Sequence, residues 1–155
     1  MKSHSRHARK LDRKRVLICL IMFFALLPVF SYLHEAGHAL VCIADGNEAE
    51  ISVNFNGGTT LCHGDISNPF PYKISGGLLA GIIGTTIGIA LFRWKIPFIA
   101  LTTIGAGHLV NAVIETFADS YFTHGAEWSF VLGFIEFVTF FSLMIIFDRK
   151  TVRAA

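Results

Sequence analysis

The sequence predicts an all-α polytopic membrane protein with about four transmembrane helices and a small β-hairpin after the first. Hydrophobic residues make up 53% of the 155 residues and charged residues only 15%, whereas an average soluble domain carries about 25% charged residues. The apolar residues gather in four long runs, each near the ~20 residues that a helix needs to cross a bilayer. A chain of this length has room for one domain, so we expect a single membrane-embedded domain over residues 16–150.

The four predicted spans cover residues 16–44, 74–92, 96–122 and 128–147. Each span should be helical, because backbone polar groups in hydrocarbon must be satisfied within the segment. The first apolar run is longer than that of a signal peptide, and no small-residue cleavage site follows it. We therefore expect it to remain in the chain as a span.

The distribution of basic residues predicts the orientation of these spans. Residues 1–15 form a basic tail with seven lysines and arginines. Other basic residues lie between the second and third spans and after the fourth: Arg93, Lys95, Arg149, Lys150 and Arg153. Because basic loops stay in the cytosol, both termini should be cytosolic. Nothing else in the chain supports nucleic-acid binding, and none is expected.

Residues 49–63 are expected to form the hairpin. Residues 51–55 alternate between apolar and polar, Asn56-Gly57-Gly58 is a turn signal, and residues 59–62 can return as a second strand. The hairpin either caps the helix ends or takes part in the function of the chain.

The three cysteines, an odd number, do not indicate a disulfide framework. Cys19 and Cys42 fall in apolar runs, where we expect them as free thiols that behave as small hydrophobes.

The second span has two sequence features that bear on its packing. Pro69 and Pro71 should break the chain before it. Within the span, glycines recur at spacings of four, three and four residues: Gly77, Gly81, Gly84 and Gly88. Such a smooth helix face allows close backbone approach, so we expect this helix to pack tightly against its neighbours.

The chain's strongest functional motif is His34-Glu35-Ala36-Gly37-His38. On a helix the two histidines lie one turn apart, so both imidazoles can bind one tetrahedral metal ion. Glu35 stands beside them, where a carboxylate can take a proton from a metal-bound water. Composition alone gives about 0.01 chance matches to this H-E-x-x-H pattern, and such residues in a membrane helix are costly unless they are paired or functional. We expect a zinc site, because zinc suits nitrogen ligands.

A catalytic zinc site needs a third protein ligand, and the third predicted span offers four polar residues on one helix face: His108, Asn111, Glu115 and Asp119. A polar face on an apolar helix should point into the bundle. A rise of ~1.5 Å per residue from the basic ends puts Glu115 and Asp119 level with the histidines and His108 too deep. Depth alone leaves the two carboxylates as equal candidates.

These features together resemble the site-2 protease family of intramembrane zinc metalloproteases. The resemblance rests on the H-E-x-x-H motif, a hairpin, a glycine-rich helix and a later helix in which Asn111 precedes Asp119 by eight residues, as in the family's asparagine–aspartate pattern. It covers residues 16–122 and leaves the fourth span as an addition. Ile114 and Ser120 stand where the family has a proline and a glycine.

The resemblance implies a zinc metalloendopeptidase with one zinc ion bound by His34, His38 and Asp119. It implies that Glu35 is the catalytic base, that Asn111 holds substrate or the developing oxyanion, and that Glu115 lines the cavity around the metal. The hairpin edge would bind an unwound substrate, which would be a membrane protein or a membrane-bound peptide in the lipid bilayer. The alternative is a catalytically inactive metal-binding scaffold or regulator. The sequence carries no signal for an oligomeric state.

Glu136 is the only charged residue within the fourth predicted span. His108 lies at nearly the same depth in the third span. We expect the two to pair inside the bundle, because an isolated charge there is expensive. Alternatively, Glu136 is protonated or lines a water path to the metal.

Overall fold

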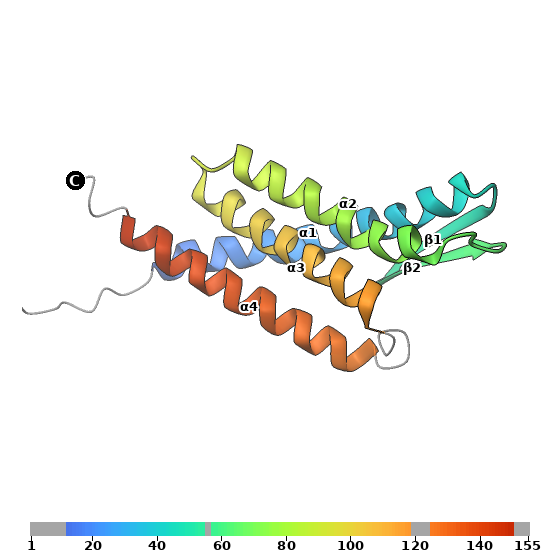
Figure 1. The fold of residues 1–155 in the computed structure, drawn as a ribbon. Helices are drawn as coiled ribbons and strands as arrows, with labels where there is room; N and C mark the ends of the chain where they lie inside the picture. Colours follow the sequence, from blue (N-terminus) through green and yellow to red (C-terminus); the bar gives the residue numbers. More distant parts are fainter. Residues whose placement is uncertain (1–11, 55–56, 119–124, 151–155) are drawn as a thin grey trace, which may run out of the picture.

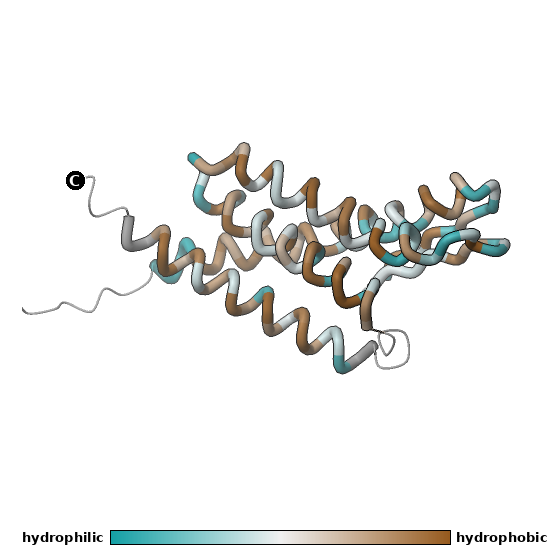
Figure 2. Tube along the Cα trace, in the orientation of Figure 1, coloured by the Kyte–Doolittle hydropathy of each residue, from teal (hydrophilic) through white to brown (hydrophobic). Residues whose placement is uncertain are grey.

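The structure is a computed structural model, and it describes residues 12–54, 57–118 and 125–150. These residues form four helices and one two-stranded hairpin (Figure 1): α1 (Arg13–Ala44), β1 (Glu48–Asn54), β2 (Gly57–His63), α2 (Pro69–Ala90), α3 (Lys95–Phe117) and α4 (Gly125–Lys150). Each of these helices contains a stretch long and apolar enough to cross a membrane. Figure 2 shows hydrophobic residues along all of them. The predicted fold class is confirmed.

Local sequence signals explain where α1 and α2 begin. Asp12 and Asn68 each cap a helix by accepting a hydrogen bond from the backbone amide two residues on, at 3.1 and 3.0 Å. α1 is 32 residues long and continues through Pro28. Pro69 and Pro71 fall in the first turn of α2, where the missing backbone N–H has no intrahelical partner to lose. The prediction that these prolines precede the second helix was therefore wrong.

The region between α3 and α4 differs from the predicted boundaries. α3 ends at Phe117, whereas the sequence predicted helix to residue 122, and α4 begins at Gly125. Residues 119–124 lie outside the described part of the chain, and Asp119 is one of them.

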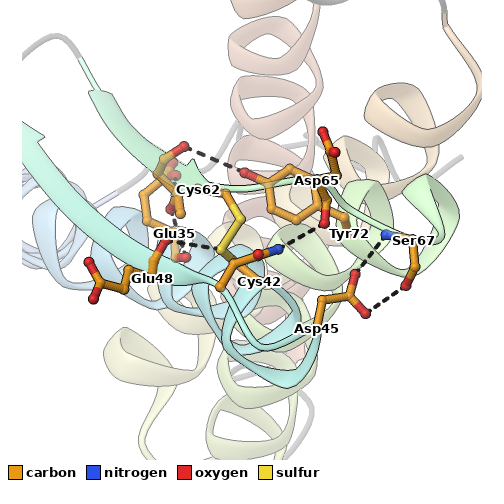
Figure 3. Close-up of a disulfide and its surroundings, with 10 residues drawn as sticks. Glu35, Cys42, Asp45, Glu48, Cys62, Asp65, Ser67 and Tyr72 are labelled. Atoms are coloured by element: carbon orange, nitrogen blue, oxygen red, sulfur yellow. Dashed lines mark hydrogen bonds between the residues drawn. A yellow bond between two sulfur atoms is a disulfide. The ribbon is translucent and has the colours of Figure 1, made fainter.

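The hairpin lies over the C-terminal half of α1 and is joined to it covalently. β1 and β2 pair antiparallel, with Glu48 opposite His63 and Asn54 opposite Gly57. Cys62 on β2 forms a disulfide with Cys42, near the end of α1 (Figure 3). The expectation that Cys42 is a free thiol was wrong, because the hairpin folds back and brings a distant cysteine within reach. Cys19 is free and buried, as expected.

The glycines of α2 set the distance between α2 and α3. A Cβ atom at Gly77 would lie 2.5 Å from the carbonyl oxygen of His108 and 2.6 Å from the amide nitrogen of Ala112. One at Gly84 would lie 3.0 Å from the Cα atom of Gly105. α2 also lies close to α1, because a Cβ atom at Gly37 of α1 would overlap the α2 backbone at Ser75 and Gly76. The predicted close packing of this helix is therefore confirmed, and it fixes α1 and α3 relative to each other.

α4 packs against α3 and approaches α1 through aromatic contacts far from the hairpin. Phe98 and Phe147 have ring centroids 4.8 Å apart, and those of Phe23 and Phe140 are 6.1 Å apart. Towards the hairpin end, α4 diverges from α1 (Figure 1). A cavity lined by both apolar and polar side chains is found in that region, as described below.

The glycine contacts predict the stability of two matched variants. Gly77→Ala should destabilise the protein by about 1–3 kcal/mol, because its new methyl group meets backbone that cannot rotate away. Gly133→Ala on α4 should be neutral or stabilise by up to ~1 kcal/mol, since nothing lies within 4 Å of the new atom and alanine favours helix. Thermal unfolding in detergent measures both. A Gly77→Ala variant as stable as wild type would contradict the close approach of α2 and α3.

Candidate metal centre

Two histidines of α1 and a glutamate of α3 meet inside the bundle. His34, His38 and Glu115 are 7%, 4% and 4% exposed. The two Nε2 atoms of the histidines are 3.1 Å apart. Oε2 of Glu115 lies 3.4 Å from Nε2 of His34, and Oε1 of Glu115 lies 3.3 Å from Nε2 of His38. The three side chains thus offer one ligand atom each around a common point, and the cluster could hold a metal ion.

The spacing of these atoms fits a tetrahedral ion. Metal–nitrogen and metal–oxygen bonds of ~2.0–2.1 Å at tetrahedral angles place ligand atoms ~3.3 Å apart. The two histidine nitrogens are 3.1 Å apart, and each lies at a similar distance, 3.4 or 3.3 Å, from a different oxygen of the Glu115 carboxylate. One ligand atom from each residue lies within 4.8 Å of the other two. Three protein ligands leave a fourth position open for water or substrate, as catalytic sites require.

The orientation of His38 is set by α2. Its Nδ1 donates to the backbone carbonyl of Tyr72 at 2.7 Å, which leaves the lone pair of Nε2 directed at the cluster. The Tyr72 ring also packs against the imidazole, with centroids 5.0 Å apart. Gly76 leaves the space that His38 occupies, because a Cβ atom there would overlap Nε2. The start of α2 therefore holds this histidine in a form that can bind a metal.

Unsatisfied polar atoms also surround the cluster. Within the described residues, Nδ1 of His34, Oε2 of Glu115 and Oδ1 of Asn111 have no hydrogen-bond partner although they are buried. Two carboxylates, those of Glu35 and Glu115, are buried close to the imidazoles. Uncompensated charges in such an interior are costly, so a divalent cation fits the charge of the site as well as its geometry.

The other site residues predicted on α3 lie at different distances from the cluster. Asn111 is buried one turn before Glu115 on α3. His108 lies closer to the centre than the depth count predicted, since its ring centroid is 5.3 Å from that of His34. Asp119, the third ligand implied by the resemblance, lies outside the described residues. Among the described residues, Glu115 is the carboxylate that lies beside the two histidines.

The expected pair of His108 and Glu136 is not formed within the described part of the chain, where no hydrogen bond or ion pair joins them. Both instead line a cavity of about 620 Å³. Its other lining residues come from α1 and the hairpin: Phe24, Leu27, Pro28, Ser31, Asn54 and Gly57. Gly107 of α3 makes room for the Glu136 carboxylate, which a Cβ atom there would overlap. A mainly apolar cavity with a few polar side chains thus lies beside the His108 ring, which contacts His34.

Glu35 is held by the hairpin. It is 7% exposed, and Oγ1 of Thr60 donates to it, lying 2.8 Å from the carboxylate Oε2 and 2.9 Å from the backbone carbonyl. Gly58 leaves room for the side chain, since a Cβ atom there would be 2.5 Å from Cγ of Glu35. Sequence reasoning missed Thr60, Gly58 and Tyr72. The alternation along β2 could have placed residues 58, 60 and 62 on one face, but not against α1.

No protein-family model, no curated protein and no solved structure matches this chain. Any assignment of function therefore depends on the motifs of this chain and on the chemistry of the centre.

The geometry predicts which side chains hold the metal. Protein purified without chelator should contain about one divalent ion per chain, measured by elemental analysis. His38→Ala and Glu115→Gln should lose most of it, because two ligands bind far more weakly than three. Glu50→Gln, on the exposed face of the hairpin, is the matched control and should keep it.

Asp119→Asn decides between the two carboxylates in the same measurement. The distances in the cluster predict that this variant keeps its metal. Metal lost in Asp119→Asn and retained in Glu115→Gln would instead identify Asp119 as the third ligand.

Proposed function

We propose that the chain is an intramembrane zinc metalloprotease that hydrolyses a peptide bond of a membrane protein or membrane-bound peptide. The observation that carries the proposal is the buried cluster of His34, His38 and Glu115, with Glu35 next to the first ligand on the same helix. Zinc is favoured because two imidazoles and one carboxylate in a four-coordinate arrangement with one open position form a typical catalytic zinc site. The resemblance to site-2 proteases supports the same reaction.

The residues of the chain divide the chemistry between them. Bound zinc would polarise the scissile carbonyl and lower the pKa of its water to about 7. Glu35 takes the proton of the attacking water and later passes it to the leaving amine. The side-chain amide of Asn111 donates to the developing oxyanion. His38, oriented by the Tyr72 carbonyl, keeps its Nε2 lone pair available as a ligand.

The cavity beside the centre supports a substrate in extended form. A helical substrate hides its carbonyl groups, so the segment to be cut must unwind. Freed backbone groups then need polar partners, because no water in the hydrocarbon core supplies them. The polar lining of the cavity, Ser31, Asn54, His108 and Glu136, offers such partners beside the ligand His34.

The proposed orientation has both termini in the cytosol. The start of α1, the α2–α3 turn and the end of α4 lie together at one end of the molecule, and the hairpin lies at the other (Figure 1). The basic residues of the sequence gather at the first of these ends, which is the pattern of cytosolic loops.

The second candidate function is a metal-binding scaffold or regulator without turnover. The same cluster would serve it, but such a protein has no use for a carboxylate at position 35. The complete H-E-x-x-H motif therefore favours the enzyme.

Glu35→Gln should abolish turnover and leave zinc bound, because the amide cannot accept the proton while the ligand set is unchanged. Cleavage of labelled casein and of a labelled single-span peptide in micelles measures turnover, and elemental analysis measures zinc. Glu48→Gln on β1 is the control and should cleave as wild type does. Cleavage retained in Glu35→Gln would reject the assigned base, and zinc binding without cleavage by wild type would favour the scaffold.

Asn111→Ala should lower kcat by about 10²–10³-fold with KM and zinc content unchanged, since it removes a donor that acts mainly in the transition state. Steady-state kinetics with the same peptide measures this effect. If Asn111 only joins helices, the variant will lose thermal stability instead and keep its kcat.

A further inference from the structure

The inner face of β2 meets one face of α1 at two points. Gly58, Thr60 and Cys62 alternate along the strand as its half-buried positions. Glu35 and Cys42 are seven residues apart on α1, which places them two turns apart on the same side of the helix. Thr60 contacts Glu35, and Cys62 is bonded to Cys42. Figure 3 shows the disulfide and Glu35 between α1 and the hairpin.

The contact at Glu35 constrains both the position and the direction of its carboxylate. The Thr60 hydroxyl reaches the carboxylate and the backbone carbonyl of the same residue, so it relates the side chain to its own helix turn. Gly58 forms the adjoining wall. Between a hydroxyl on one side and backbone on the other, few rotamers of Glu35 remain open.

The contact at Cys42 holds the strand in that register. Thr60 and Cys62 are two residues apart, about 6.6 Å along the strand. The polar ties at the same end of the hairpin are exposed to solvent: Asp45 accepts from Ser67, and Asn47 donates to the carbonyl of Asp65. Water competes with such bonds. Thr60 itself is tied to α2 by a longer, part-buried bond, since the Tyr72 hydroxyl donates to its backbone carbonyl at 3.5 Å. The disulfide is the covalent tie, which water does not weaken.

We propose that Thr60 is a positioning residue for Glu35 and that the Cys42–Cys62 disulfide keeps Thr60 in place, so that turnover requires the oxidised hairpin. This inference rests on the proposed function. Opening the bond consumes two electrons and two protons from a dithiol, which itself becomes a disulfide, and leaves Cys42 and Cys62 as thiols. The protease is then active on the oxidising side of a membrane and acts on substrate segments that emerge there.

Two substitutions at Thr60 separate positioning from packing. Thr60→Val keeps the shape and removes the hydroxyl, and should lower kcat by about 10- to 100-fold with KM and zinc content unchanged. Thr60→Ser keeps the hydroxyl and should stay within about threefold of wild type. A Thr60→Val variant with wild-type kcat, or equal losses in both variants, would overturn the role of the hydroxyl.

The full-length Cys42→Ser/Cys62→Ser variant tests the disulfide. It should lose kcat to a similar extent and keep its zinc, and treatment with a phosphine reductant should reproduce the loss in wild type without further effect on the variant. Cys19→Ser is the control and should remain active and sensitive to the reductant. Adding Thr60→Val to the double variant should cost less than it does in wild type, because both changes act through Glu35. Wild-type kcat in the double variant would overturn the proposal.

Hydrogen exchange keeps the test separate from the proposed function. Backbone amides of residues 57–63 should exchange faster after reduction and in the double variant than in wild type. Zinc-free or inactive wild-type protein would reject the proposed metalloprotease function. Unchanged exchange after reduction would reject the proposal that the disulfide holds β2 in place, whether or not the protein is an enzyme.

Discussion

The cost of burying ionisable groups in a membrane interior governs this structure. Two imidazoles and a carboxylate lie within 3.1–3.4 Å of one another, and all three are buried. A shift of one helix by a single residue would separate them and leave each group without compensation. α1 and α3 must therefore be held in one register, although direct contact between them does not do this alone. α2 lies between them and supplies that restraint through its backbone, where Gly77 faces α3 and Ser75 and Gly76 face Gly37 of α1.

α2 also has a chemical part in the centre. The same turns that pack on α1 bring the Tyr72 carbonyl to Nδ1 of His38 and leave space at Gly76 for its ring. Helix packing and the orientation of His38, a candidate metal ligand, thus depend on one short stretch of α2. The hairpin holds Glu35 in a similar way, through contacts of Thr60 and Gly58 with its side chain. The two restraints meet at Tyr72, whose backbone carbonyl accepts from His38 and whose hydroxyl donates to the backbone carbonyl of Thr60. The orientation of the candidate ligand and that of the proposed base are therefore linked through one residue of α2.

Features that depend on one helix or on composition could be predicted from the sequence. The spans, the hairpin, the glycine face of α2 and the one-turn spacing of His34 and His38 are of this kind. Contacts between elements could not. The disulfide of Cys42 depends on the path of the hairpin over α1. The place of His108 beside His34 depends on how α3 packs against α1, which a count of residues along each helix does not give. Glu115 and Asp119 share one helix face, so periodicity could not choose between them. The prediction that His108 pairs with Glu136 was wrong, because equal depth in two helices does not determine which way their side chains point.

The length of α1 has a consequence for the hydration of the centre. A helix of 32 residues is about 48 Å long, whereas the hydrocarbon core of a bilayer is about 30 Å thick. With the first basic turn at one boundary, the H-E-x-x-H turn comes close to the other. Lipids of different chain length move that boundary by several ångströms and so submerge the centre or bring it towards the headgroups. The thickness of the surrounding membrane thus affects the site, since it sets how readily water, the second reactant of the proposed hydrolysis, reaches Glu35.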